Sequence, residues 1–112
     1  MFSAIWSFLK NAAASFWNAV KRLWRAVVNF FKNVVEYFRK LRLDRNKHKP
    51  FIADLRQLKP KIKNAPERNV GIFEGVYNEE TDEIEHAQII EADRLDDKTK
   101  DILDNDPLVI LS

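Results

Sequence analysis

Apolar residues recur with a seven-residue period along the first 43 residues, a stretch that contains neither Gly nor Pro. When the sequence is aligned in sevens from Ile5, the second and fifth columns are almost entirely apolar and the seventh is polar throughout. On a helix, these columns and their neighbours cover an apolar arc of roughly 140°. The pattern predicts one long amphipathic helix within residues 1–45, about 65 Å in length if unbroken. A helical hairpin with its break near residues 11–15 is the alternative.

The strict seven-residue period also predicts that the helix packs in a supercoil. A straight helix drifts by about 20° per heptad against a seven-residue repeat, so keeping the stripe on one partner requires a left-handed supercoil. The remaining residues are too few to cover such a face, and leaving it exposed would promote aggregation. We therefore expect self-association or membrane contact through a face made of the following residues: Trp6, Leu9, Phe16, Trp17, Val20, Leu23, Trp24, Val27, Phe30, Phe31, Val34 and Phe38.

The charged side of the same stretch is basic. Its predicted basic face consists of Lys21, Arg22, Arg25, Lys32 and Arg39. Aromatic, basic amphipathic helices suit the surface of an anionic membrane, whereas the regular heptad favours a helical bundle. Nucleic-acid binding is a third reading, but the aromatic residues lie on the apolar face and are not interleaved with the charges, as base stacking would require.

The middle of the chain, residues 46–69, has the pattern of a connector with one short helix. Phe51, Ile52, Leu55 and Leu58 recur at helical spacing after Pro50, which predicts a helix over residues 51–58. The two-proline sequence of residues 59–69 predicts a linker or an extended arm. His48 is expected to be a solvated connector residue.

Residues 70–112 predict a small acidic ββαβ module. Two β-prone runs, residues 70–77 and 83–91, flank an acidic turn and indicate a hairpin. The two glycines of the chain, Gly71 and Gly75, lie in the first run and indicate a bulge or a close backbone approach. A helical pattern over residues 93–105, with Asp96 or Asp97 as N-cap, precedes an apolar strand over residues 108–111. This strand is expected to lie centrally or to pair with a partner chain.

The acidic patch of this module consists of Glu79, Glu80, Asp82, Glu83 and Glu85. It lacks the spacing of a calcium loop, and we interpret it as a solvated hairpin tip. His86 is expected on a strand surface. The sequence contains no phosphate-binding glycine loop, nucleophile elbow or paired-histidine zinc motif, so we predict no metal, no cofactor, no small-molecule substrate and no enzymatic activity.

Charge is distributed unevenly along the chain. The net charge of +2 combines +9 in residues 1–50 with −7 in residues 51–112, so the acidic half is a candidate to dock on the basic half. There is no Cys. Charged residues interrupt every apolar run before it could span a bilayer, and the start of the chain does not have the pattern of a secretory signal. The default expectation is a cytoplasmic protein with peripheral membrane contact.

The sequence thus predicts an α+β protein with a dominant N-terminal helix, a short middle helix and the ββαβ module. The expected function is non-enzymatic self-assembly, as a homo-oligomer, together with association with an anionic membrane surface. The alternatives are a helical-bundle scaffold or adaptor without membrane contact and a basic nucleic-acid-associated protein.

Overall fold

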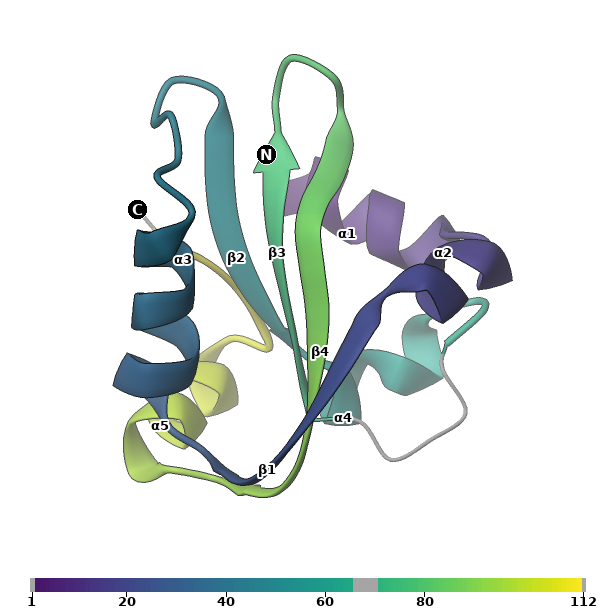
Figure 1. Ribbon diagram of the computed structural model, residues 1–112. Coiled ribbons are helices and arrows are strands. Elements are labelled where there is room, and N and C mark those ends of the chain that lie inside the picture. Colours follow the sequence, from purple (N-terminus) through teal and green to yellow (C-terminus); the bar gives the residue numbers. More distant parts are fainter. Residues whose placement is uncertain (1, 66–70, 112) are drawn as a thin grey trace.

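A single five-stranded mixed sheet runs through the protein in the computed structural model, which describes residues 2–65 and 71–111 (Figure 1). The strands are β1 (Lys21–Val28), β2 (His48–Asp54), β3 (Ile72–Asn78), β4 (Glu83–Leu95) and β5 (Leu108–Ile110). They are arranged in the order β1-β4-β3-β2-β5. The β1–β4 pair is parallel and the other three pairs are antiparallel.

Helices cover both faces of this sheet, so the molecule has three layers (Figure 1). Helices α1 (Phe2–Asn11), α2 (Ala14–Ala19) and α4 (Leu55–Leu58) cover the face that we call the closed face, and the short 3₁₀ turn η2 (Lys59–Lys61) follows α4. The π-helical segment η1 (Phe30–Val35), its continuation α3 (Glu36–Lys40) and α5 (Asp97–Asn105) cover the other face, which we call the groove face. Each face has its own apolar core.

The predicted 43-residue helix is wrong. The stretch is divided into two short helices, the strand β1, and the η1–α3 helix. The first break, between Asn11 and Ala14, falls where the hairpin alternative placed one, but a strand follows α2 where that alternative required a second long helix. The prediction failed because the absence of Gly and Pro does not guarantee helix.

Local sequence explains where this stretch leaves the helical conformation. Residues 20–28 contain three valines and a tryptophan, which favour an extended backbone that can pair with a neighbouring strand. Asn29 then caps η1, since its side chain accepts a hydrogen bond from Lys32 N (3.0 Å). The Asn33 side chain in turn accepts one from Asn29 N (2.7 Å). This reciprocal pair fixes the start of the helix as a capping box does.

The predicted helix over residues 51–58 is correct only in its second half. Residues 48–54 form β2, which lies between β3 and β5, and Phe51, Ile52 and Ala53 are fully buried. A strand covered on both faces has a continuous apolar run, which periodicity alone does not distinguish from a buried helix. Asp54 ends the strand and caps α4 by accepting a hydrogen bond from Arg56 N (3.0 Å).

The C-terminal strand–strand–helix–strand order occurs as predicted, but it does not form a separate ββαβ module. Strand β2, from the middle of the chain, lies between β3 and β5, so the core is shared with all earlier segments. The strand β5 pairs with β2 of the same chain and lies at the sheet edge, so the expectation of a central position is wrong. Asp96 is the N-cap of α5 and accepts a hydrogen bond from Thr99 N (2.9 Å).

Both glycines lie at close backbone or side-chain approaches, as predicted. A Cβ at Gly71 would lie 2.3 Å from Ile90 O. A Cβ at Gly75 would lie 2.8 Å from Phe73 Cε1, and Gly75 stands at the irregularity of the β3–β4 ladder. On β4, His86 has a positive φ of 53°. The two strands bend here because one of them carries an extra residue.

Candidate functional site

The apolar face predicted from the heptads is divided between the two cores. Leu9, Trp17 and Val20 are buried in the closed-face core, against which Trp6 and Phe16 pack. Phe30, Val34 and Phe38 are buried in the groove-face core. Leu23 and Val27 are half-buried on β1. Only Trp24 and Phe31 remain as large exposed apolar side chains among the described residues, at 60% and 61% of their full exposure.

The predicted basic face is also divided. Lys21, Arg22 and Arg25 lie on β1, where Arg22 forms an ion pair with Glu91 (3.3 Å). Lys32 and Arg39 lie exposed on the η1–α3 helix. The five cations therefore belong to two separate surfaces.

The acidic patch lies on the β3–β4 turn, next to the connector that precedes β2. Asn78 organises this turn because its side-chain oxygen accepts from Glu80 N (2.9 Å) and its amide donates to Glu85 Oε2 (2.8 Å). Beside it, Tyr77 donates to Asp82, and this hydrogen bond, together with burial and nearby carboxylates, raises the pKa of Tyr77 to about 12. The Asp82 side chain is thus engaged within the turn.

Three residues at the end of the connector and the start of β2 lie near this turn. Lys47 Nζ lies 4.0 Å from Glu80, Lys49 Nζ lies 4.0 Å from Glu79, and His48 Nε2 lies 3.7 Å from Glu85. Here the basic half of the chain contacts the acidic half through single pairs of charged or polar side chains, which are exposed or half-exposed. Such pairs contribute little stability.

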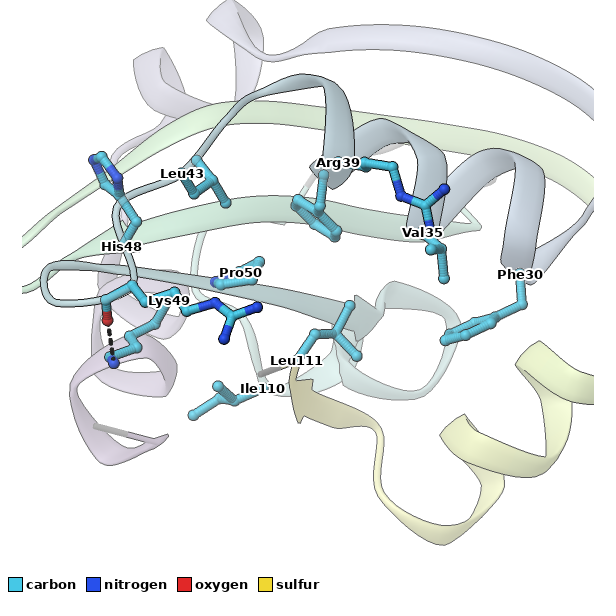
Figure 2. Close-up of a pocket in the computed structure, with 11 residues that line it drawn as sticks. Phe30, Val35, Arg39, Leu43, His48, Lys49, Pro50, Ile110 and Leu111 are labelled. Atoms are coloured by element: carbon cyan, nitrogen blue, oxygen red, sulfur yellow. Dashed lines mark hydrogen bonds between the residues drawn. The ribbon is translucent and has the colours of Figure 1, made fainter.

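A groove of about 1060 Å³ opens on the groove face, between the η1–α3 helix, the connector and the β2–β5 edge (Figure 2). This volume reaches the upper end of the range for small-molecule sites, about 300–1,000 Å³. The groove is lined by seven apolar residues, namely Phe30, Val35, Phe38, Leu43, Pro50, Ile110 and Leu111, and by four residues that carry or can carry positive charge, namely Arg39, Arg45, His48 and Lys49. Ile110 also packs against the closed-face core, so the groove reaches around the β2–β5 edge. Its lining is therefore a mainly apolar floor with a cationic rim.

Two of the rim cations have no counter-ion. Among the residues that the structure describes, neither the Arg39 nor the Arg45 side chain forms an ion pair, and both residues are exposed. In Figure 2, Arg39 extends along the helix beside Val35. Lys49 is held at the rim because its Nζ donates to Arg45 O (2.9 Å). The rim therefore presents positive charge that the described part of the chain does not neutralise.

His48 lines the groove but its imidazole is engaged outside it. Its Nδ1 accepts a hydrogen bond from Asp44 N (2.9 Å), so its Nε2 carries the proton that faces Glu85. In Figure 2 the ring points away from Pro50 and Leu111. His48 is thus a half-buried structural residue of the connector, where the sequence had predicted a solvated one.

A buried carboxyl lies under the helix layer of the groove face. Glu74, on the central strand β3, is fully buried, and one oxygen accepts from Gln88 Nε2 (2.7 Å) while the other has no partner among the described residues. Burial raises the pKa of Glu74 to about 8, against which the Gln88 hydrogen bond acts. Burial and the nearby Glu74 also raise the pKa of Tyr37, whose hydroxyl donates to His86 O (2.5 Å). Glu74 is therefore protonated at neutral pH.

Sequence reasoning missed both Glu74 and the groove. A glutamate inside the apolar run of β3 was the signal for the first, because a charged residue rarely lies in a buried strand without a partner or a raised pKa. The groove gave no local signal, since it joins residues from four separated elements. No group of three potential metal ligands occurs within residues 2–65 and 71–111.

No helix of the described chain is long and apolar enough to cross a membrane. No protein-family model matches the sequence, and comparison with curated proteins and with solved structures gives no significant match. The groove and its cationic rim are accordingly the basis for assigning a function.

Proposed function

We propose that the protein is a non-enzymatic binding module that works at an anionic membrane surface, where the groove takes one anionic lipid. The acidic head group lies between Arg39 and Arg45, and the first part of the acyl chain lies on the apolar floor. The observation that carries this proposal is a groove lined by seven apolar residues and by two arginines that form no ion pair with any residue that the structure describes.

The chemistry of the rim favours a phosphate or carboxylate head. Arginine binds such groups through two parallel hydrogen bonds, which are stronger than neutral ones and specific in geometry. Hydrogen bonds to charged groups contribute about 1.5–3 kcal/mol each. Lys49, whose Nζ donates to Arg45 O and lies 4.0 Å from Glu79, lines the same rim.

The floor supports an apolar tail. Each methylene group that leaves water contributes about 0.8 kcal/mol. The groove has room for several of them because its volume of about 1060 Å³ exceeds what a head group alone would fill. A purely polar anion would leave most of this floor in contact with water.

The outer surface of the η1–α3 helix supports a membrane as the source of the lipid. Phe31 is 61% exposed, and its ring lies 5.6 Å from that of Phe30, which lines the groove. Residues 30–49 contain seven Lys and Arg against two acidic residues, a net charge of +5. An exposed aromatic residue next to cations suits the lipid interface, and each cation near an anionic surface contributes about 1 kcal/mol.

There is less reason to expect self-association than the sequence alone suggested. Ten of the twelve stripe residues are buried or half-buried within the chain itself, so burying the stripe does not require a second copy. Homo-oligomerisation stays a prediction, to be tested by measuring the molar mass in solution.

Flotation with lipid vesicles tests the proposed function. We expect the protein to float with phosphatidylcholine vesicles that contain phosphatidylglycerol and not with pure phosphatidylcholine vesicles. The Arg39→Gln/Arg45→Gln variant should bind at least about tenfold more weakly, since losing one charged hydrogen bond already corresponds to that factor. The matched control is Lys61→Gln/Lys63→Gln, which removes two exposed cations next to η2, away from the groove.

A second experiment distinguishes between a membrane lipid and a free amphiphile as the ligand of the groove. Titration with dodecanoate below its micelle concentration shows whether a single anion enters the groove without a bilayer. Binding of dodecanoate without flotation would keep the groove as an amphiphile site and exclude the membrane. Equal flotation of the groove and control variants would overturn the groove as the lipid site.

A further inference from the structure

A second surface, distinct from the groove, lies at the opposite edge of the sheet. Strand β1 is the last strand on that side and pairs only with β4 among the described residues. In Figure 1 it crosses the front of the molecule. An eight-residue edge strand presents a row of backbone groups that can pair with another chain.

We propose that this edge binds an extended acidic peptide segment of a partner protein, which adds a sixth strand beside β1. Strand addition of this kind obtains affinity from main-chain hydrogen bonds and specificity from the side chains along the edge. The side chains along β1 that carry the proposal are Lys21, Trp24 and Arg25, all exposed.

Arg25 provides the argument for an acidic partner. Its Nη1 donates to Trp24 O at 2.8 Å, so the guanidinium covers a backbone carbonyl in the middle of the strand. Within the described residues neither Arg25 nor Lys21 has a counter-ion. A carboxylate on the incoming strand would attract Arg25 away from this carbonyl and leave the oxygen free to accept an N–H from the new strand.

The same charges disfavour a second copy of the chain as the occupant. Antiparallel pairing of two β1 edges centred on Arg25 would place the Arg25 side chains of both copies directly opposite each other, and like charges in that position are destabilising. An acidic strand has the opposite effect. Trp24, at 60% exposure, provides the large aromatic contact on which interfaces commonly depend.

Binding of a defined peptide tests the proposal. The probe is a fluorescein-labelled, end-capped octapeptide of alternating glutamate and valine, measured by fluorescence anisotropy with the full chain. We expect saturable binding that weakens with added salt, and that is at least tenfold weaker in the Arg25→Gln and Trp24→Ser variants. The matched control, Lys61→Gln, should bind as the unmodified protein does.

Two further probes show whether the backbone takes part. A peptide with lysine in place of glutamate should bind at least tenfold more weakly, and so should one that is N-methylated at every residue, because alternate N–H groups of a strand point to opposite edges and only full methylation removes the donors of both edges. Hydrogen exchange of the β1 amides should slow on addition of the acidic peptide. Unfolding midpoints of the variants show that the fold is retained.

Several outcomes would overturn the proposal. They are the absence of measurable binding, equal binding of the N-methylated peptide, equal binding by Arg25→Gln, or a molar mass showing that a second copy already occupies the edge. Because none of these variants alters Arg39, Arg45 or the groove floor, such a failure leaves the lipid proposal standing and is distinguishable from it.

Discussion

The two faces of the sheet are built for different purposes. On the closed face, Trp17 contacts Phe16 and Phe73 edge to face, at centroid distances of 5.2 and 5.6 Å, and the helices α1, α2 and α4 complete the core. On the groove face the helix layer covers a buried acid, Glu74, and leaves an open groove. The first face is closely packed with apolar side chains, whereas the second contains a buried carboxyl and an open groove.

The largest expected effect is on the closed face. Replacing Trp17 by Ala removes a side chain that is 1% exposed and should lower the free energy of unfolding by about 3–5 kcal/mol, measured by urea denaturation. Trp17→Phe keeps a ring in place and also removes an indole N–H that has no partner in the described chain, so its cost should stay below about 1.5 kcal/mol. Trp24→Ala on the exposed edge should change stability by no more than about 0.5 kcal/mol. Equal losses for Trp17→Ala and Trp24→Ala would contradict the assignment of the core.

The second prediction concerns Glu74 and pH. The pKa of this carboxyl is about 8 in the folded protein against 4.5 ordinarily. Between these values the folded chain keeps a proton that the unfolded chain has lost. The stabilising effect of protonated Glu74 is therefore complete below about pH 4.5 and is lost as the pH rises to about 8. The slope is at most about 1.4 kcal/mol per pH unit.

Glu74→Gln keeps the shape and the polarity of the side chain but does not ionise. We expect this variant to be more stable than the parent protein near pH 8 and to lose the slope, as measured by urea denaturation across this pH range. Glu80→Gln, on the exposed turn, is the matched control and should keep the slope of the parent. If the slope survives in Glu74→Gln, another group is responsible for it.

The third prediction tests the junction between η1 and α5. Asp96 accepts hydrogen bonds from Thr99 N (2.9 Å) and from Phe30 N (3.1 Å). Burial alone would raise its pKa, but the hydrogen bond that Thr99 Oγ1 donates (2.5 Å), together with these two, outweighs burial and lowers the pKa of Asp96. Asp96→Ala should lower the free energy of unfolding by about 1–2 kcal/mol, as the loss of a helix cap does. The exposed Asp97→Ala is the control, and an equal cost would show that the cap is not Asp96.

The smallest effect on stability is expected at the groove itself. Arg39→Gln/Arg45→Gln removes two exposed side chains without ion pairs in the described chain, so stability should change by no more than about 0.5 kcal/mol. The same variant should lose lipid binding. A large loss of stability would mean that these residues are structural, and the contrast between the two faces would fail.

Much of the local structure in the second half of the chain follows from its sequence. The two β-prone runs within residues 70–91 and the cap at Asp96 depend on local sequence, and the two glycines signalled the close approaches to Ile90 and Phe73. The local structure of the first half could not be predicted from its sequence. The seven-residue period there is equally compatible with short helices and a strand that bury residues on both faces of a sheet. Asn29 was the local sign that the long helix ended and a new one began, since it has the side chain of an N-cap.

The candidate site could not be predicted from the sequence for a different reason. Its cations Arg39, Arg45 and Lys49 were visible, but only the sheet order, with β5 beside β2, brings Ile110 and Leu111 under them. Glu74 could have been found from its apolar neighbours. The sequence could not show that one oxygen of this carboxyl has no partner among the described residues, because this depends on the helix layer above Glu74.

The most direct test of the central claim is a map of amide chemical shifts on titration with dodecanoate. We expect changes at Arg39, Leu43, Lys49, Ile110 and Leu111 that saturate together, with the amides of α1 and α2 unchanged. Changes confined to the closed face, or spread evenly over both faces, would contradict the claim that the groove face is the binding face.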